Sequence, residues 1–368
     1  MKKISLIGIG KLGLCLALTL EKSGYDVLGC DVNEDYVKLI NSKTFQSDEQ
    51  GVNELLIKSK NFRATTNLRE CCDHSDMLFV LVATPSLPNG KYDHSQVDRV
   101  INNVLSLERP EKPKHFVICC TTMPGYCDEA QSKLEMHNYI VSYNPEFIAQ
   151  GTIIRDQARP DMVLIGEGSA EAGDLIQEIY EKSTLNEPTF NRMSLTEAEI
   201  CKISLNCFLT TKISFANMIG DIARFSGCRP DPILKAIGTE SRISPKYLGY
   251  GYGYGGPCFP RDNRALAIYA GEKGVEAKIS LASDEFNKIH LEYQVELFKR
   301  ENSTDKPVVF DYVTYKPEST MLVESQQLLF AKELAENGYT VIVKERESVI
   351  QEVKEIYGDL FLYKRSEK

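Results

Sequence analysis

MKKISLIGIGKLG, residues 1–13, joins a short apolar run to three glycines in the spacing G-x-G-x-x-G. The apolar run predicts a buried strand and the residues after the glycines predict a helix, so the glycines lie in the turn between the two. Gly8, Gly10 and Gly13 permit a tight turn and let a pyrophosphate approach the helix N-terminus. Asp31 ends the next apolar run about 20 residues further on, where an acid binds the ribose hydroxyls of NAD rather than NADP. The predicted cofactor contacts are Gly8, Ile9, Gly10, Lys11, Leu12, Gly13 and Asp31.

Apolar runs alternate with helical stretches from residue 4 to about residue 165. The runs, such as DMLFVLVAT and HFVICC, are continuously apolar, as expected for strands that are buried on both faces. The alternation predicts a doubly wound, Rossmann-like parallel sheet with helices on both faces. Ligands of such sheets bind beyond the carboxyl ends of the strands. Two later strands end in loops, one with Thr84 and Pro85 and the other with Thr122. We expect these loops to line the cofactor and substrate cleft, although both also fit ordinary turns.

The second half begins with an uninterrupted helical pattern over residues 194–226, far longer than an average helix. Its apolar residues occupy more than one face, which predicts a homodimer interface; burial within its own chain is the alternative. Further helices are predicted over 264–271 and 278–299, followed by a smaller α/β unit with a helix over 323–336. The predicted domains are residues 1–190 for cofactor binding, 191–300 for dimerisation and catalysis, and 301–368 for the small α/β unit.

The composition argues against several classes of protein. A net charge of -9 disfavours a nucleic-acid surface, because binding to the phosphate backbone needs clustered positive charge. No apolar run approaches the ~20 residues that a membrane span needs. The eleven cysteines are an odd number without the spacing of metal ligands. We therefore expect no metal site, no disulfide framework and a cytoplasmic location.

Cys258 closes a glycine- and tyrosine-rich loop, YLGYGYGYGGP over residues 247–257, and begins a predicted helix. Glycines let the backbone approach a ligand and tyrosines supply flat faces, so we expect this loop to bind substrate. A helix N-terminus and the nearby Arg261 both favour the thiolate, which makes Cys258 a candidate nucleophile. Asp262 lies on the same helical face and could orient Cys258, a water or a lysine. A buried small hydrophobe and a first-turn acid are the ordinary alternatives for the two residues.

Lys202 and Asn206 lie four residues apart in the long predicted helix, so both project from one face. An ammonium and an amide together suit the developing alkoxide of an alcohol oxidation, or a tetrahedral thioester adduct. Two solvated polar residues are the alternative, which their apolar neighbours disfavour. Glu146, in Asn-Pro-Glu-Phe after another strand, is a candidate general base for water, with an ordinary surface acid as its alternative.

With these motifs in this order, nearly the whole chain resembles the UDP-glucose/GDP-mannose dehydrogenase family. The resemblance implies an NAD-dependent, four-electron oxidation of the C6 alcohol of a nucleotide sugar, first of all UDP-glucose to UDP-glucuronate, through a thiohemiacetal and a thioester on Cys258. It also implies a dimer formed along the long helix and a C-terminal domain that binds the nucleotide. The implied catalytic residues are Cys258, Lys202, Asn206, Asp262, Glu146 and Thr122. The implied substrate contacts are Glu146, Phe147, Lys202, Asn206, Arg242, Tyr247, Leu248, Tyr250, Gly255 and Lys316, with Arg242 reaching the substrate of the neighbouring subunit.

Three positions depart from the family pattern. Gln150 stands where a second glutamate is usual, and an amide cannot serve as a general base. Val323 and Met162 stand where arginine is common, and the C-terminal domain ends early. These changes bear on cofactor affinity and nucleotide specificity more than on the chemistry.

Several alternatives remain open from the sequence. GDP-mannose or another nucleotide sugar could replace UDP-glucose as the substrate. A two-electron hydroxyacid dehydrogenase shares the Rossmann and long-helix plan, but needs no cysteine in the loop. A protein that binds nucleotide sugar and NAD without turnover is suggested by Gln150, Val323 and the short C-terminal domain.

Overall fold

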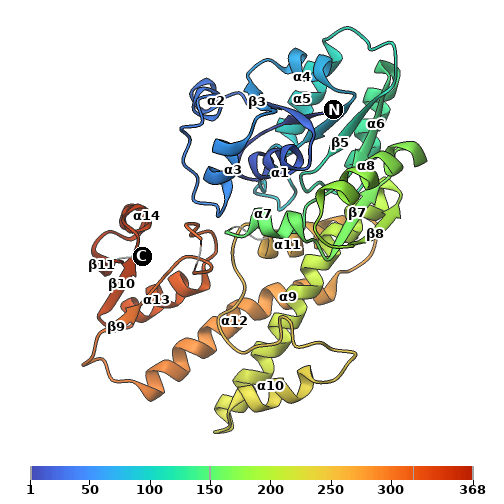
Figure 1. The fold of residues 1–368 in the computed structure, drawn as a ribbon. Coiled ribbons are helices and arrows are strands. Elements are labelled where there is room, and N and C mark those ends of the chain that lie inside the picture. The colour runs from blue at the N-terminus through green and yellow to red at the C-terminus, as the bar shows by residue number, and fades with distance from the viewer. Residues whose placement is uncertain (1, 149–150, 318, 367–368) are drawn as a thin grey trace. The chain divides into compact units, whose positions relative to one another are not determined.

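The computed structural model describes residues 2–148, 151–317 and 319–366, and the chain forms two compact units, residues 1–202 and 203–368 (Figure 1). Gln150 lies outside the described residues. The long helix α9 (Leu195–Phe225) begins in the first unit and ends in the second. The separation of residues 191–300 from 301–368 as two domains stays a prediction.

The first unit is built on an eight-stranded sheet in the order β3-β2-β1-β4-β5-β6-β7-β8. Its strands are β1 (Lys3–Ile7), β2 (Asp26–Cys30), β3 (Phe62–Thr65), β4 (Met77–Val80), β5 (Lys114–Ile118), β6 (Tyr139–Tyr143), β7 (Met162–Gly166) and β8 (Thr189–Met193). Its helices are α1 (Lys11–Lys22), α2 (Glu34–Asn41), α3 (Val52–Lys58), α4 (Leu68–His74), α5 (Ser95–Leu105), α6 (Tyr126–Leu134), η1 (Glu135–His137), α7 (Ile153–Ala158) and α8 (Ala170–Ser183). The predicted Rossmann-like fold is confirmed; β3 and β8 were not predicted.

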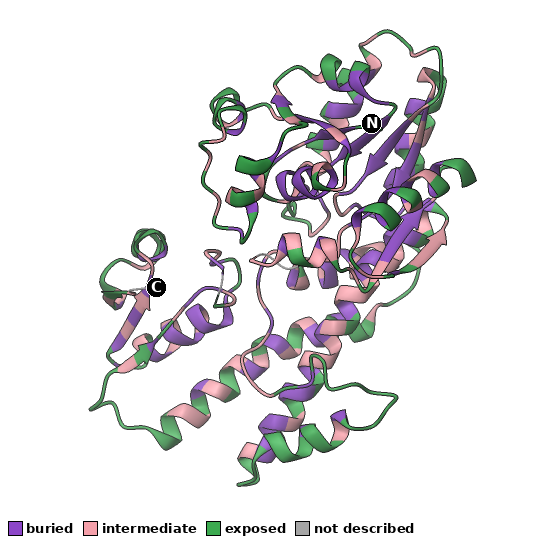
Figure 2. Cartoon of the chain, in the orientation of Figure 1, coloured by how far each residue is buried: buried purple, intermediate pink, exposed green. Residues whose placement is uncertain are grey.

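Both faces of the sheet are buried, as the continuously apolar runs indicate (Figure 2). Successive side chains of a strand point to opposite faces. Leu6 and Phe79 accordingly join one core cluster, whereas Ile7 and Leu78 join another. Each strand can therefore be apolar at every position and still bury all of its side chains.

One pairing differs from the predicted parallel sheet, because β7 is antiparallel to β6, with Tyr143 opposite Gly166. In the described part of the connection, residues 144–148 and 151–161, the helix is the six-residue α7. β7 runs back along the segment after β6, where the Asn144 side chain donates to the Leu164 carbonyl at 2.9 Å.

The second unit contains the remaining helices and a small parallel sheet in the order β11-β10-β9. Its elements are α10 (Pro230–Gly238), α11 (Phe259–Glu272), α12 (Lys278–Glu301), β9 (Val308–Phe310), α13 (Gln326–Glu336), β10 (Val341–Glu345), α14 (Glu347–Tyr357), η2 (Gly358–Leu360) and β11 (Leu362–Arg365). The helix expected from Val323 begins at Gln326, because the Ser325 hydroxyl accepts from the Leu328 N–H and caps it.

α9 reverses the usual amphipathic pattern of a surface helix. A stripe of polar residues is buried along it, at spacings of three, four or eight: Glu199, Lys202, Thr210, Ser214, Asn217 and Asp221. A second stripe is apolar and exposed: Phe208, Phe215, Met218, Ile222 and Phe225. Among the described residues, no helix is long and apolar enough to cross a membrane.

Candidate active site

The glycine loop between β1 and α1 has the geometry of a phosphate-binding turn. Gly8 has a φ of +89°, and a Cβ there would lie 2.8 Å from the Leu81 carbonyl oxygen. A Cβ on Gly13 would lie 2.1 Å from the Gly8 carbonyl oxygen, so only glycine fits. A Cβ on Gly10 would meet nothing within 4 Å, which leaves space beside the α1 N-terminus. The loop thus fits the pyrophosphate of a dinucleotide.

The other side chains of this loop have mixed roles. Ile9 is buried in the core, so only its backbone can face a ligand, and Leu12 packs against that core with a half-buried side chain. The Lys11 ammonium lies 3.7 Å from the buried Glu49 carboxylate, which also accepts from the Gly151 N–H at 2.7 Å. Asp31 directly follows β2, at the carboxyl edge where a ribose is expected.

The loops after β4 and β5 are held together at the same edge of the sheet. The buried Thr84 donates its hydroxyl to the Thr121 carbonyl at 2.8 Å, and Pro85 is exposed. The Met123 N–H donates to His94 Nε2 at 3.2 Å. Burial lowers the pKa of His94 to about 4, so its ring is neutral and can accept this bond.

Thr122 is fully buried, and its hydroxyl donates to Glu199 at 2.7 Å. Glu199 was not among the predicted site residues. Its signal in the sequence is its position in the long predicted helix, three residues before Lys202.

Glu146, Phe147 and Lys202 come together at the end of β6. The Lys202 ammonium donates to the Glu146 carbonyl and lies 4.1 Å from the centre of the Phe147 ring. The Glu146 Oε1 atom is shielded from solvent, and no described residue lies in hydrogen-bond geometry with it. Burial raises the pKa of Glu146 to about 7, and the charge of Lys202 and contacts with Gln157 and Tyr180 oppose this rise. A carboxylate with such a pKa can take up a proton near neutral pH.

The second unit brings Asn206, Asp262 and the Cys258 backbone together. Cys258 is exposed and precedes the first residue of α11, as predicted. Asp262, one turn later, is fully buried and accepts from Asn206 Nδ2 at 2.6 Å and from Arg261 Nε at 3.1 Å. Asn206 therefore holds the carboxylate that follows the candidate nucleophile.

A polar network that the sequence did not reveal anchors the glycine- and tyrosine-rich loop. His290 on α12 lies with Nδ1 2.7 Å from Asp221 and with Nε2 2.7 Å from the Gly251 carbonyl. Tyr250 donates its hydroxyl to Asp221 at 3.0 Å. The Asn287 side chain bonds both the N–H and the carbonyl of Tyr254. The loop is thus an ordered, fixed segment.

The remaining predicted substrate contacts of this region are more dispersed. Leu248 is buried in a small core with Ala216 and Leu234. Tyr247 is half exposed, with a φ of +61°. The Arg242 side chain is 85% exposed and pairs with Glu240 of its own segment. Arg242 is therefore directed to solvent in the single chain.

Gly255 lies against the segment that precedes α13. A Cβ on Gly255 would lie 2.2 Å from the Glu324 carbonyl oxygen, and the Gly256 N–H donates to the Val323 carbonyl at 2.8 Å. Lys316 extends past the ring of Tyr315 in the same segment, 5.7 Å from its centre. The backbone of residues 323–324 thus supports the loop that ends at Cys258.

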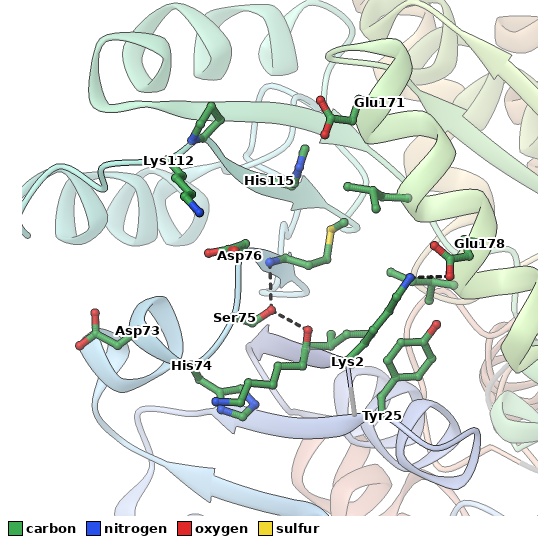
Figure 3. A pocket seen from close by; sticks show the side chains of 16 residues that line it. Lys2, Tyr25, Asp73, His74, Ser75, Asp76, Lys112, His115, Glu171 and Glu178 are labelled. Carbon is green, nitrogen blue, oxygen red and sulfur yellow. Dashed lines mark hydrogen bonds and ion pairs between the residues drawn. The ribbon is translucent and has the colours of Figure 1, made fainter.

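A separate pocket of about 790 Å³ lies at the opposite edge of the first sheet, where β1, β4 and β5 begin (Figure 3). It has lysines and acids in its wall, and Lys2 pairs with Glu178 across it. Ligands of these sheets bind at the carboxyl edge, so this pocket is not a candidate for cofactor or substrate.

Two family models match the chain. The NAD binding domain of the UDP-glucose/GDP-mannose dehydrogenase family matches residues 2–184, and the central domain of the same family matches residues 196–289. The chain belongs to the UDP-glucose/GDP-mannose dehydrogenase family. The predicted resemblance and the predicted cofactor, NAD, are thereby confirmed.

Named relatives in this family cover most of the chain. A UDP-glucose 6-dehydrogenase of Haloferax volcanii is 28% identical over 354 residues, which are 92% of this chain and 82% of the relative. A GDP-mannose 6-dehydrogenase of Pseudomonas syringae is 31% identical over 291 residues, which are 75% and 66% of the two chains. A solved UDP-glucose dehydrogenase from Pyrobaculum islandicum is 27% identical with a TM-score of 0.88, over 99% of this chain and 86% of that chain.

Two departures from the family pattern can be placed in the structure. Met162 begins β7, and the Asn191 amide lies 3.7 Å from its sulfur. Val323 has a half-exposed side chain, while the adjacent Glu324 binds Arg264 of α11 at 2.8 and 2.9 Å. The segment before α13 is therefore tied to α11 by an arginine of α11 itself.

Proposed function

We propose that this chain oxidises the C6 alcohol of a nucleotide sugar to a carboxylate in two NAD-dependent steps, with UDP-glucose as the first candidate substrate. The observation that carries the proposal is Cys258. It is an exposed thiol that precedes the first turn of α11, after an ordered glycine loop and one turn before the buried Asp262. A helix N-terminus favours thiolate, and a simple two-electron alcohol dehydrogenase has no need of such a group.

In the proposed reaction, the glycine loop would hold NAD, which would supply the hydride acceptor for both oxidations. Cys258 adds to the aldehyde that the first oxidation forms and gives a thiohemiacetal, which the second oxidation converts to a thioester. The Asn206–Asp262 pair holds the start of α11 while Cys258 reacts. The Lys202 ammonium, which contacts the Glu146 carbonyl and the Phe147 ring, is proposed to stabilise a developing oxyanion.

The last step, hydrolysis of the thioester, needs a base for water. Glu146 suits this role, because burial raises its pKa to about 7 and keeps a proton acceptor available near neutral pH. Glu146 would deprotonate the water that attacks the thioester, and hydrolysis would then release the sugar acid from Cys258. This role fits a chain in which Gln150 stands where its relatives usually have a second glutamate.

The choice of UDP-glucose rests on likeness to solved structures. A solved UDP-glucose dehydrogenase has a TM-score of 0.88, against 0.62 for a GDP-mannose dehydrogenase from Pseudomonas aeruginosa. The curated relatives include enzymes named for each substrate. GDP-mannose is therefore the alternative substrate.

We also propose that the enzyme is a homodimer formed along α9. The exposed apolar stripe consists of Phe208, Phe215, Met218, Ile222 and Phe225, with Phe208 63% and Ile222 58% exposed. A repeated apolar face on a long helix is typical of a subunit interface. In such a dimer, the solvent-directed Arg242 of one subunit would reach the substrate site of the other subunit. A cytoplasmic location is proposed from the eleven free cysteines.

The test is NADH formation by purified protein with UDP-glucose, GDP-mannose and UDP-N-acetylglucosamine in parallel, counted per sugar consumed. We expect one substrate to yield about two NADH, as the thioester route requires. Cys258→Ser should bind NAD with the wild-type affinity and form no acid. About one NADH per sugar with release of an aldehyde would indicate a two-electron dehydrogenase, and binding of sugar and NAD without any NADH would indicate a protein without turnover.

A further inference from the structure

We infer that Glu199 is a positioning residue that holds the loop after β5 against the first turns of α9, and that NAD binding and turnover depend on it. The kinetic part of this inference rests on the proposed function. Glu199 is fully buried and lies one helical turn before Lys202.

The Glu199 carboxylate receives three hydrogen bonds, all from the segment that follows β5. Oε1 accepts from the Thr122 hydroxyl at 2.7 Å and from the Cys127 N–H at 2.9 Å, and Oε2 accepts from the Gly125 N–H at 2.6 Å. A buried carboxylate without such partners would be costly. Burial accordingly raises the pKa of Glu199, and these hydrogen bonds oppose the rise.

The sequence of this loop explains why a distant residue is needed. α6 begins after Gly125, whose φ is +98° and which has no side chain to cap the helix. The first N–H groups of a helix need an acceptor, and an anion is favoured there. Glu199 supplies this acceptor from α9, so one carboxylate fixes both the helix start and the loop before it.

The loop held in this way lies at the edge where the cofactor is expected. Thr121 bonds Thr84 of the neighbouring loop, and Met123 bonds His94. Thr122 is completely buried with its hydroxyl directed at Glu199. Thr122 therefore acts as a positioning residue that holds the loop through Glu199.

The experiment compares four single variants of the full-length protein and the double variant Glu199→Gln/Thr122→Val. Glu199→Gln keeps the shape of the side chain, but it places an NH₂ group where an acceptor is needed. Thr122→Val removes one donor and Thr122→Ser keeps it. Glu197→Gln is the matched control, since Glu197 is on the same turn of α9, caps Ser194 of its own helix and has no bond to the loop.

The first readout is hydrogen exchange of residues 121–130 together with NAD affinity by calorimetry, neither of which needs turnover. We expect the Gly125 and Cys127 amides to exchange faster in Glu199→Gln and NAD to bind more weakly, with neither change in Glu197→Gln. If the wild-type protein turns over no nucleotide sugar, the proposed function fails, and these two measurements still decide the role of Glu199.

The second readout is steady-state kinetics. We expect kcat to fall roughly 10- to 100-fold in Glu199→Gln and in Thr122→Val, as when reacting groups are slightly misplaced. Thr122→Ser should keep most of the activity. The double variant Glu199→Gln/Thr122→Val should be no less active than Glu199→Gln alone, because Glu199→Gln already removes the Thr122–Glu199 bond. Unchanged exchange at Gly125 and Cys127, or a lower Tm with unchanged kcat and NAD affinity, would overturn the inference. If Glu199→Gln does not fold, Thr122→Val and Thr122→Ser decide it by the same criteria.

Discussion

Asn206 donates a 2.6 Å hydrogen bond to Asp262, and Asp262 lies one helical turn after Cys258. The carboxylate is fully buried and also accepts from Arg261 Nε at 3.1 Å. We expect Asn206→Ala to reduce the free energy of unfolding by about 1–3 kcal/mol, because a buried acceptor loses a donor. Asn206→Asp should be more damaging above pH 6, since it places two carboxylates together. Urea unfolding and kcat measure both effects, and an aspartate variant as stable and active as the wild type would contradict this account.

The pH dependence of turnover should report Glu146. Its pKa is raised to about 7 by burial, so the unprotonated base increases as the pH rises through 7. We expect kcat to rise over this range and level off at higher pH, if hydrolysis limits the rate. In Glu146→Gln the thioester on Cys258 should accumulate and be detected by mass spectrometry. A kcat that is constant between about pH 5 and 9 would remove Glu146 from the rate-limiting step.

The stability of the protein should also depend on the protonation of Glu146. It should fall as the pH rises, whereas kcat should rise. A carboxyl whose folded pKa lies above its unfolded pKa favours the folded state at low pH, and this contribution is lost as the pH rises through the folded pKa, about 7. Glu146→Gln should therefore have a higher Tm than the wild type at pH 8. The two proteins should differ little below the ordinary pKa of glutamate. Differential scanning calorimetry at the two pH values measures the difference, and an equal Tm at pH 8 would be inconsistent with a buried, charged Glu146.

Lys202→Met should affect catalysis more than cofactor affinity. The Lys202 charge stabilises ionised Glu146, so its removal should move the inflection of the kcat profile to higher pH. Loss of the ammonium should also lower kcat by roughly 10²–10³-fold, in the range found when one oxyanion donor is removed. Calorimetric titration with NAD and pH–rate profiles separate these effects. A change in NAD affinity alone would show that Lys202 does not take part in the chemistry.

Two glycines of the cofactor loop should respond differently to the same substitution. A Cβ on Gly13 would overlap the Gly8 carbonyl oxygen, so Gly13→Ala should lower both Tm and NAD affinity. A Cβ on Gly10 has open space in the protein, so Gly10→Ala should fold with an unchanged Tm. We expect Gly10→Ala still to weaken NAD binding, because the methyl group would occupy the space of the pyrophosphate. Full NAD affinity in Gly10→Ala would mean that the ligand does not approach this glycine.

The exposed stripe of α9 predicts the oligomeric state. Phe215→Asp places a charge in the middle of the stripe and should convert a dimer to monomers, because interface cores exclude unpaired charge. Met136→Asp is the control, since Met136 is also exposed and apolar but lies on η1. Sedimentation velocity measures the mass of each. A wild-type monomer, or a dimer that survives in Phe215→Asp, would refute an interface along α9.

Local sequence was sufficient for those parts of the fold and site that depend on neighbouring residues. The turn at Gly8 to Gly13, the position of Asp31 after a strand and the helix that starts at Cys258 follow from spacing and from the backbone freedom of glycine. Burial of the first sheet on both faces was also predictable, because a strand that is apolar at every position is stable only where both of its faces are covered.

The antiparallel β7, the Glu199 carboxylate that caps α6 and the His290–Asp221 pair under the glycine loop were not predictable in this way. Each joins segments that are far apart in the sequence. Packing, and the need of buried polar groups for hydrogen bonds, determine which segments meet. Neither effect produces a repeating pattern in the local sequence from which it could be predicted.

The sequence by itself determined the family, the NAD loop and the identity of the candidate nucleophile, because these depend on short segments whose chemistry is local. The tertiary structure alone decided that α9 buries its polar stripe and exposes its apolar one. It also decided that the Thr122 hydroxyl is directed to Glu199, and that Glu146 is sufficiently buried for its pKa to rise to about 7. Desolvation and hydrogen-bond partners depend on what surrounds a side chain in space, and residue order does not specify those surroundings.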